Sequence, residues 1–316
     1  MKRFIKSLRK LFRDRLNKVD AKALEILLEK ESISIIDLGA AGGIEPRWAK
    51  ISAYINYFGF EPDSRTIQLD PNQVFKSYTV IPSLVSNKSE YKDLYISHEE
   101  GKSSIYQPNS EFISRFPNST RFEIVKTVSL ETSTIDTLIK QEIDFIKLDI
   151  QGAELDALQG SQVVLKSVLG IESEVEFMEL YKSQPLFSHV NEFLLKQGFE
   201  FIDFTNLRRW ERDNLGKIGQ CVFGDGLYLR SPEFVLSSRY SEIKIRRYLA
   251  ILFLYNRFDL IEVVLKNNPE LAFHLKKFNL LLSKKRTRLN FAVKINMFTQ
   301  KLLSFIGVEF KSQLIY

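Results

Sequence analysis

Short apolar runs alternate with stretches of helical periodicity between Ser32 and Arg230. Continuous apolar runs of this length are typical of buried strands, and strands that alternate with helices indicate a mostly parallel sheet covered by helices. The last two runs are joined by a charged connector without helical period, so we predict that they pair antiparallel. The sequence thus predicts an α/β fold with seven main strands at residues 33–40, 55–62, 77–86, 143–150, 169–177, 199–206 and 220–230.

The remaining pattern predicts helices, a hairpin and a loop. Helical spacing covers residues 153–167 and 190–197, and Gly198 is a typical residue for ending the second helix. Residues 91–97 read as a small hairpin strand, and residues 98–112 as a loop over an edge or mouth of the sheet. Beyond residue 230 the pattern is helical, at 243–265 and again at 291–305. We predict a basic helical segment at 1–30, a main domain at 31–230 and a helical extension at 231–316.

Composition places the chain among ordinary soluble proteins. It has 316 residues, of which 44% are hydrophobic and 27% charged. The single cysteine, Cys221, excludes an internal disulfide and suits a reducing compartment. The first residues lack a secretory signal pattern, and the longest apolar run, residues 248–255, is too short to span a bilayer. We therefore predict a cytoplasmic protein.

The net charge of +6 is unevenly distributed. Residues 1–30 carry ten Lys or Arg against four Asp or Glu, residues 231–316 carry fifteen against six, and the middle is acidic. Basic and apolar positions in residues 1–18 form an amphipathic helical pattern, which could pack on the domain with a solvated basic face. Alternatively, this segment and the basic C-terminal extension could contact the anionic inner face of a membrane. Nucleic-acid binding is disfavoured because the central domain is acidic. The sequence does not indicate an oligomeric state.

The segment "IIDLGAAGG" at 35–43 predicts a ligand-binding turn after the first strand. Glycine allows a tight reversal and leaves backbone open to a ligand. Asp37, Gly39 and Gly43 give the spacing D-x-G-x-x-x-G, whereas dinucleotide folds use G-x-G-x-x-G to hold a pyrophosphate. An acid at this position favours a cofactor with an ammonium group and no phosphates, of which S-adenosylmethionine is the common one.

A second acid, Glu61, ends the next strand, where a carboxylate can accept hydrogen bonds from both ribose hydroxyls. Neither Asp37 nor Glu61 by itself identifies a cofactor site. The alternative is that Asp37 and Glu61 are exposed acids that cap turns. A nicotinamide cofactor would also suit the Gly39 to Glu61 spacing, but the phosphate-binding glycines are absent.

The segment "FIKLDIQGAELDALQG" at 145–160 carries more information. Lys147 and Asp149 are two residues apart and so share one face of the predicted strand. Asp149 ends that strand, at the edge where open α/β sheets bind ligands, and Gly152 turns the chain into a helix whose first turn contains Glu154.

Several segments, in order, resemble the FkbM family of S-adenosylmethionine-dependent methyltransferases. The family carries K-x-D-x-x-G-x-E after its fourth strand, as residues 147–154 do. The resemblance covers residues 31–230 and implies a class I methyltransferase, Rossmann-like fold with an antiparallel last strand. It also implies O-methylation of a hydroxyl, often on a sugar, glycan or polyketide. The segments that carry the resemblance are "IIDLGAAGG", "FGFEPD", "SSIYQPN", "IDFIKLDIQGAELDALQG" and "GDGLYLR".

The resemblance also implies site residues. Asp149 is the first candidate for a general base, with Glu154 as a second. His98 is a further candidate because of its place at the start of the loop at 98–112, independently of the resemblance. Each has an alternative: Asp149 forms an ion pair with Lys147, Glu154 stabilises the start of its helix, and His98 is an ordinary loop residue. We predict no metal site, although Asp149 with Glu154 could hold a hard divalent cation. The cofactor-binding candidates are Asp37, Gly39, Ala40, Gly43, Glu61 and Asp63.

The sequence therefore predicts an S-adenosylmethionine-dependent O-methyltransferase that acts on a hydroxyl of a saccharide or glycan precursor. A catalytically silent glycan-binding or scaffolding module with the same fold is the alternative hypothesis. The acceptor itself cannot be identified from the sequence, because acceptor specificity depends on loops.

Overall fold

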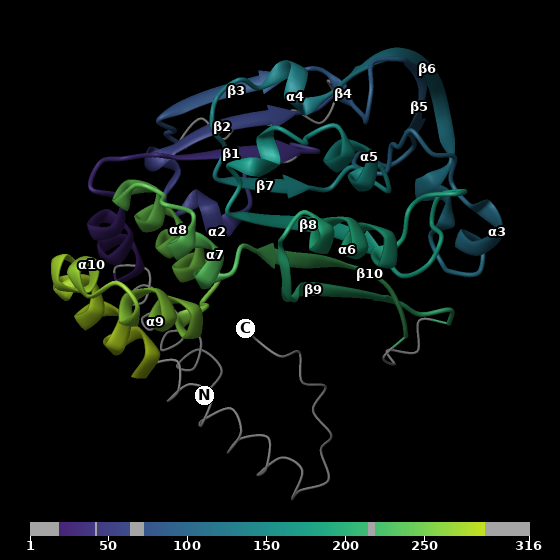
Figure 1. Cartoon of the computed structure of the whole chain (residues 1–316). Coiled ribbons are helices and arrows are strands. Elements are labelled where there is room, and N and C mark those ends of the chain that lie inside the picture. The colour runs from purple at the N-terminus through teal and green to yellow at the C-terminus, as the bar shows by residue number, and fades with distance from the viewer. Residues whose placement is uncertain (1–18, 42, 64–72, 214–218, 288–316) are drawn as a thin grey trace, which may run out of the picture. The chain divides into compact units, whose positions relative to one another are not determined.

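A computed structural model describes residues 19–41, 43–63, 73–213 and 219–287 of the chain (Figure 1). The chain divides into two compact units. One unit contains residues 32–234, and the other combines residues 1–31 with residues 235–316. The sequence predicted separate N-terminal and C-terminal segments, whereas in the structure both belong to the same unit.

A seven-stranded sheet runs through the larger unit in the order β3-β2-β1-β7-β8-β10-β9. Neighbouring strands are parallel from β3 to β8, whereas β10 is antiparallel to both β8 and β9. The predicted fold, with its antiparallel last strand, is confirmed. The strands are β1 (Ile33–Leu38), β2 (Ile55–Phe60), β3 (Ser77–Ile81), β7 (Phe145–Leu148), β8 (Gly170–Glu176), β9 (Glu200–Trp210) and β10 (Gln220–Leu229).

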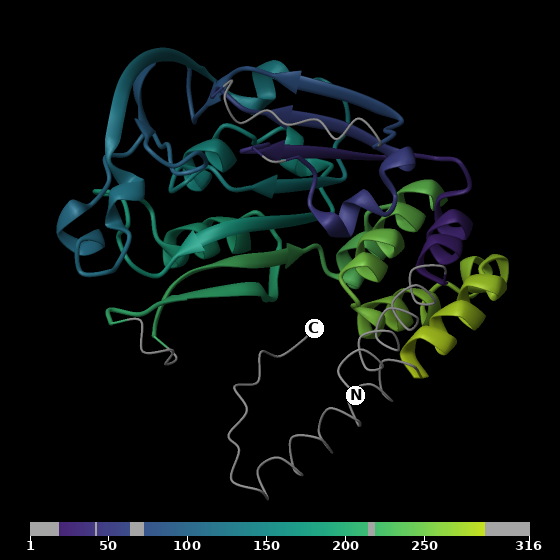
Figure 2. The same ribbon diagram turned by 180° about the vertical axis from the view of Figure 1, so that it is seen from behind.

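One face of this sheet is apolar and packs against α4 (Ile135–Leu138), α5 (Glu154–Gln159) and α6 (Phe187–Lys196), as Figures 1 and 2 show from opposite sides. Parallel strands with helices on a face bury that face completely, which explains its β-branched and leucine residues. The core residues from the strands on this face include Ile36, Leu38, Ile146, Leu148, Ile171 and Val175.

On the opposite face of the sheet, charged residues of the neighbouring strands β1, β7 and β8 lie side by side. Asp37 of β1 lies opposite Lys147 of β7, which lies opposite Glu172 of β8. The short helix α2 (Pro46–Ala49) packs on this face, where the rings of Trp48 and Phe145 are 4.8 Å apart. A buried charge is costly unless it is paired, so each of these charged side chains needs a partner on a neighbouring strand.

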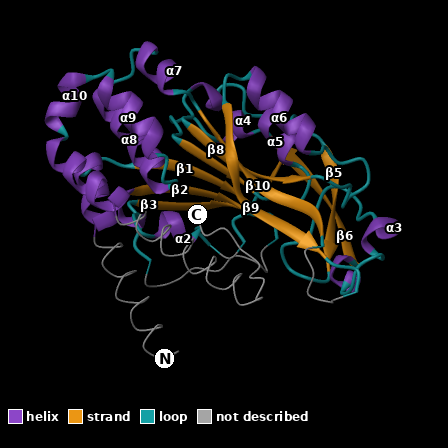
Figure 3. Ribbon diagram, turned by 90° about the horizontal axis from the view of Figure 1, so that it is seen from below, coloured by secondary structure: helices purple, strands orange, loops and turns teal. Residues whose placement is uncertain are grey.

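A three-stranded sheet, β4-β6-β5, lies beside the end of the large sheet where the helix α3 (Ser110–Ile113) also lies (Figure 3). The hairpin strand predicted at 91–97 is β5 (Tyr91–Ser97), and β4 is Leu84–Val85. Strand β6 (Ile124–Ser133) pairs with both β5 and β4. The sequence did not predict β6, because most of its residues are exposed or half-buried and form no apolar face. Two single 3-10 turns, Ser52–Tyr54 and Ser119–Phe122, complete the connections.

The helix predicted at 153–167 is shorter than expected. Helix α5 ends at Gln159, and a 3-10 turn follows at Val164–Lys166. A Cβ at Gly160 would lie 2.2 Å from the carbonyl oxygen of Ser86, so a neighbouring backbone packs against the helix end. The carboxylate of Asp136 then accepts hydrogen bonds from the amides of residues 163 and 164, both at 2.9 Å, and starts the second turn.

The smaller unit is helical within its described residues. A helix at 19–28 belongs to it, and the helix predicted at 243–265 is two helices, separated by a turn in which Asn256 has φ +56°. An ion pair of 3.0 Å joins the buried side chains of Lys285 and Asp20, from opposite ends of the chain. The helices are α7 (Pro232–Ser237), α8 (Glu242–Leu254), α9 (Phe258–Lys266), α10 (Pro269–His274) and a helix at 276–287.

Two predicted segments lie outside the described residues: the amphipathic pattern in residues 1–18 and the helix at 291–305. Within the described part of the chain, none of the helices has both the length and the apolar character needed to cross a bilayer.

Candidate active site

The turn after β1 brings the backbone of Gly39 into direct contact with the tip of β7. Gly39 has φ +80°, and its amide donates to the carbonyl oxygen of Phe60 at 3.0 Å. A Cβ on Gly39 would lie 1.9 Å from the carbonyl oxygen of Asp149. Glycine is therefore required here both for its backbone conformation and for the close approach of two strand ends.

A cavity of about 370 Å³ opens at these strand ends. Four predicted residues line it: Gly39, Glu61, Asp63 and Asp149. This brings the turn after β1, the end of β2 and the end of β7 to one site, as expected where parallel strands end together. The volume falls in the range of small-molecule sites.

The other predicted cofactor-binding residues are not among those that line the cavity. Ala40 is buried and packs near Gly59, where an added Cβ would lie 3.0 Å from the Cβ of Ala40. Gly43 has φ +81°, and its amide donates to the carbonyl oxygen of Ala40 at 3.2 Å, which closes the turn. Asp37 is not among the residues that line the cavity. Its cofactor-binding role stays a prediction.

Asp37 instead forms part of a buried charge network. Its Oδ2 accepts a hydrogen bond of 2.7 Å from the hydroxyl of Tyr57, and its Oδ1 lies 3.8 Å from Nζ of Lys147. The same Nζ lies 3.8 Å from Oδ2 of Asp149. Burial raises the pKa of Asp37, although Lys147 and Tyr57 oppose this effect. Burial alone would lower the pKa of Lys147, but Asp37 and Asp149 hold that pKa above its usual value.

Asp149 and Glu154 have different environments. The side chain of Asp149 is 38% exposed and lines the cavity. Glu154 is 2% exposed, and its Oε1 accepts a hydrogen bond of 2.8 Å from the amide of Ile150. Its carboxylate thus holds the turn between β7 and α5, which is a structural role at the start of its helix. Burial raises the pKa of Glu154 to about 7.

Three buried glutamates on β8 were not anticipated as site residues. Glu172, Glu174 and Glu176 alternate along the strand and are each less than 9% exposed. Burial raises the pKa values of Glu174 and Glu176 well above their usual range. The sequence "GIESEVE" resembles a strand with one solvated face, so only the contacts from neighbouring strands identify these acids as buried.

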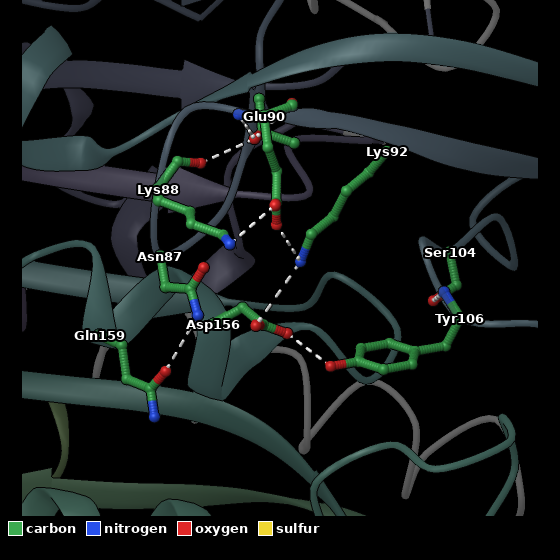
Figure 4. A network of polar contacts seen from close by, with 9 residues as sticks. Asn87, Lys88, Glu90, Lys92, Ser104, Tyr106, Asp156 and Gln159 are labelled. Atoms are coloured by element: carbon green, nitrogen blue, oxygen red, sulfur yellow. Dashed lines mark hydrogen bonds and ion pairs between the residues drawn. The ribbon is translucent and has the colours of Figure 1, made fainter.

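The loop predicted over the mouth of the site does line the cavity, through residues 100–105. Ser104 Oγ donates to the carbonyl oxygen of Gln151 at 2.7 Å. The hydroxyl of Tyr106 donates to Asp156 Oδ2 of α5 at 2.6 Å, and Lys92 of β5 lies 3.8 Å from the other oxygen of Asp156 (Figure 4). These contacts attach the loop to the segment that carries Asp149.

His98 is exposed and is not among the residues that line the cavity. Its amide donates to the carbonyl oxygen of Glu123 at 2.8 Å, so its backbone continues the β5–β6 pairing. Its proposed role as a base therefore has no support from this arrangement. In the described part of the chain, no group of three or more His, Cys, Asp or Glu is arranged to hold a metal ion.

The cavity fits a positively charged cofactor that lacks phosphates. Its charged lining residues are Glu61, Asp63, Glu100 and Asp149, with Lys102 as the single cation among the described lining residues. A pyrophosphate would be repelled by these carboxylates, whereas a sulfonium or ammonium would be attracted. An apolar wall suits a flat base, and it contains Phe60, Leu84, Val85, Leu94, Ile105 and Ile150.

Comparison with known proteins decides the family. The profile described as "Methyltransferase FkbM domain" matches residues 37–201, just over half of the chain. The chain belongs to the FkbM methyltransferase family. It is thus an S-adenosylmethionine-dependent methyltransferase, as the sequence predicted, and the match begins at Asp37 and includes the whole K-x-D-x-x-G-x-E segment.

Individual relatives are distant. The 2-O-methyltransferase NoeI of Sinorhizobium fredii (strain NBRC 101917 / NGR234) is 25% identical over 171 residues, which cover 50% of this chain and 69% of NoeI. A crystal structure of a methyltransferase FkbM from Methylobacillus flagellatus KT is 16% identical with a TM-score of 0.37, over 63% of this chain and 43% of that protein. The magnesium protoporphyrin IX methyltransferase ChlM of Synechocystis PCC 6803, solved with bound SAM, is 9% identical with a TM-score of 0.35, over 69% of this chain and 80% of ChlM. This chain therefore spans less than half of the solved FkbM protein.

The raised pKa of Glu154, about 7, leads to a prediction for stability. A carboxyl whose folded pKa is raised contributes stability that is fully present below its unfolded pKa and is lost as the pH rises through about 7. Glu154→Gln cannot ionise and keeps an acceptor for the amide of Ile150. We expect the variant to match the wild type near pH 4 and to exceed its unfolding free energy by about 1–3 kcal/mol near pH 8.

Denaturant unfolding of both proteins across this pH range tests the prediction. Parallel stability curves for Glu154→Gln and wild type would show that the Glu154 carboxyl does not titrate in this range. The exposed substitution Glu192→Gln serves as a control, since its side chain is 65% exposed.

Proposed function

We propose that this enzyme transfers a methyl group from S-adenosylmethionine to a hydroxyl of a saccharide or glycan precursor, with Asp149 as the general base. The observation that carries the proposal is the position of Asp149. Its carboxylate is more than one-third exposed and lines the same cavity as Gly39 and Glu61. The relative NoeI, described as a 2-O-methyltransferase, supports a hydroxyl as the acceptor group.

The reaction requires alignment, removal of water and removal of one proton. The cofactor, when bound, supplies a methyl group activated by a sulfonium. A sugar hydroxyl is barely ionised at neutral pH, so a base within hydrogen-bond reach assists its attack. Asp149 would take this proton. Glu154 is less suited, because its carboxyl is buried and bonded to the turn that it stabilises.

Gly39 and Glu61 would hold the cofactor. Gly39 lines the cavity where its backbone packs directly against the carbonyl group of Asp149, so this turn sets the shape of the site at the two strand ends. Glu61 lies at the end of β2, where its carboxylate can accept hydrogen bonds from ribose hydroxyls. The loop at 100–105 lines the site and would help to exclude water, which favours methyl transfer to the acceptor.

Two measurements test the proposal. Titration calorimetry with S-adenosylhomocysteine measures cofactor-site binding, and transfer of labelled methyl groups to a cell-envelope polysaccharide extract measures the reaction. We expect Asp149→Asn to bind S-adenosylhomocysteine within a few-fold of wild type and to lose at least about 100-fold in transfer rate, because an amide cannot accept the proton. Unchanged transfer by Asp149→Asn would exclude its role as base.

The catalytically silent module remains the competing hypothesis. It predicts that the wild-type protein binds S-adenosylhomocysteine but methylates no component of the extract. A wild-type protein that binds neither S-adenosylmethionine nor S-adenosylhomocysteine would contradict both hypotheses.

A further inference from the structure

The side chain of Gln151 forms hydrogen bonds with Asp149, Glu174 and Tyr181. It is 5% exposed and lies two residues beyond Asp149, with φ +56°. Residues other than glycine rarely adopt this conformation, which costs about 1–2 kcal/mol. Surrounding contacts must therefore hold the residue in place.

Both amide hydrogens of Gln151 are used by carboxylates. Its Nε2 donates to Oδ1 of Asp149 and to Oε1 of Glu174, each at 2.8 Å. An amide group has two donor hydrogens, so this side chain has none left for another partner. One oxygen of Asp149 is thus occupied by Gln151, while its other oxygen, Oδ2, lies 3.8 Å from Lys147.

The orientation of the Gln151 amide is set from its other side. The hydroxyl of Tyr181, which is fully buried, lies 2.9 Å from Oε1 of Gln151 and 3.1 Å from the carbonyl oxygen of Lys102, and its one hydrogen is shared between these two acceptors. Rotating the amide by half a turn would direct its oxygen at the Asp149 carboxylate, which repels it, and would turn its NH₂ group toward the Tyr181 hydroxyl. The hydroxyl of Ser104 also fixes the Gln151 backbone by donating to its carbonyl oxygen at 2.7 Å.

We propose that Gln151 is a positioning residue for methyl transfer: held by Tyr181 and Ser104, it fixes the Asp149 carboxylate so that Oδ2 faces the acceptor hydroxyl. This inference rests on the proposed function of Asp149. A base must lie within hydrogen-bond reach of its proton in a defined orientation, and small misplacements reduce rates strongly. The loop that carries Ser104 also lines the cavity, so the same contacts link this loop to the base.

Three substitutions separate the parts of this arrangement. Gln151→Met keeps the side-chain length and removes both donors. Gln151→Glu adds a third carboxylate between Asp149 and Glu174. Tyr181→Phe keeps the ring and removes the hydroxyl that orients the amide. Gln159→Met is the matched control, because Gln159 is an exposed glutamine on α5 (Figure 4).

The experiment measures kcat against pH with labelled S-adenosylmethionine and the polysaccharide extract, and the Kd for S-adenosylhomocysteine by calorimetry. We expect Gln151→Met to lower kcat about 10- to 100-fold and Tyr181→Phe about 3- to 10-fold, with Kd unchanged within about a factor of two. The acid limb of the kcat profile should move to higher pH in Gln151→Met and further in Gln151→Glu, because the ionised base loses a donor or gains a negative neighbour. Gln159→Met should match wild type.

Each other outcome contradicts the inference. A Gln151→Met protein with wild-type kcat and pH profile would show that Asp149 needs no such support. A parallel loss of S-adenosylhomocysteine binding would assign Gln151 to cofactor binding or to folding instead. If wild type transfers methyl groups but Asp149→Asn does so equally well, the positioning role fails while the methyltransferase function stands. A wild-type protein without transfer would contradict the proposed function and, with it, this inference.

Discussion

Substituting Gly39 by alanine is expected to abolish cofactor binding. The added methyl group would lie 1.9 Å from the carbonyl oxygen of Asp149 and 2.9 Å from its carbonyl carbon. Backbone atoms cannot move aside as a flexible side chain can, so the ends of β1 and β7 would have to separate. Alanine also adopts φ +80° at a cost, so steric clash and backbone strain add. We expect the variant to lose about 2–5 kcal/mol in unfolding free energy. We also expect it to bind S-adenosylhomocysteine at least about 100-fold more weakly.

Gly101→Ala is the matched control for this substitution. Gly101 has φ +77°, almost the same as Gly39, but a Cβ there would meet nothing within 4 Å. We expect it to lose only about 1–2 kcal/mol in unfolding free energy. Because Gly101 itself lines the cavity, this control is compared with Gly39→Ala by its stability and not by its affinity. Circular dichroism on both variants separates backbone strain from steric clash, and calorimetry measures the affinity of Gly39→Ala. A folded Gly39→Ala protein with wild-type affinity would show that the turn does not form the cofactor site.

Substituting Lys147 by methionine is expected to cause the largest loss of stability. Lys147 lies between Asp37 and Asp149, and Asp37 is only 3% exposed. Removing one partner of a buried pair leaves an uncompensated charge, at a cost of about 3–5 kcal/mol. Denaturant unfolding should show this loss. Adding Asp37→Asn should restore part of it, because the buried carboxylate is then replaced by a neutral amide.

Lys196→Met provides the comparison at the surface. Lys196 pairs with Glu192, but both side chains are at least 65% exposed, so the pair is solvated and we expect no measurable loss of stability. Equal stability of Lys147→Met and wild type would mean that the charges of Asp37 and Asp149 are compensated without the lysine.

The sequence predicted those features that depend on local pattern. The seven strands of the large sheet follow apolar runs, although the run predicted as one strand at 77–86 is divided between β3 and β4, which belong to different sheets. The antiparallel pairing of β9 and β10 follows from a connector without helical period. Gly39, Glu61 and Asp149 were predicted from their positions at strand ends, and they do line one cavity. Strand ends are recognisable in a sequence because glycine and acidic residues interrupt an apolar run.

The features that the sequence did not reveal depend on contacts between distant segments. Strand β6 has no buried face of its own, and α5 stops at Gln159, next to the point where the backbone at Ser86 packs against Gly160. Gln151 appears as an ordinary polar residue until Tyr181, Glu174 and Ser104 surround it. Such roles require the three-dimensional arrangement, since nothing in residues 145–155 specifies the partners.

The insertion of β10 between β8 and β9 limits how the enzyme can be shortened. The region matched by the family profile ends at residue 201, within β9 and before β10 begins. A truncated chain ending there would leave β8 as an open edge, with its acidic side chains deprived of the strand that covers them. A fragment that keeps the seven-stranded sheet complete therefore has to extend to Leu229, well past the region matched by the family profile.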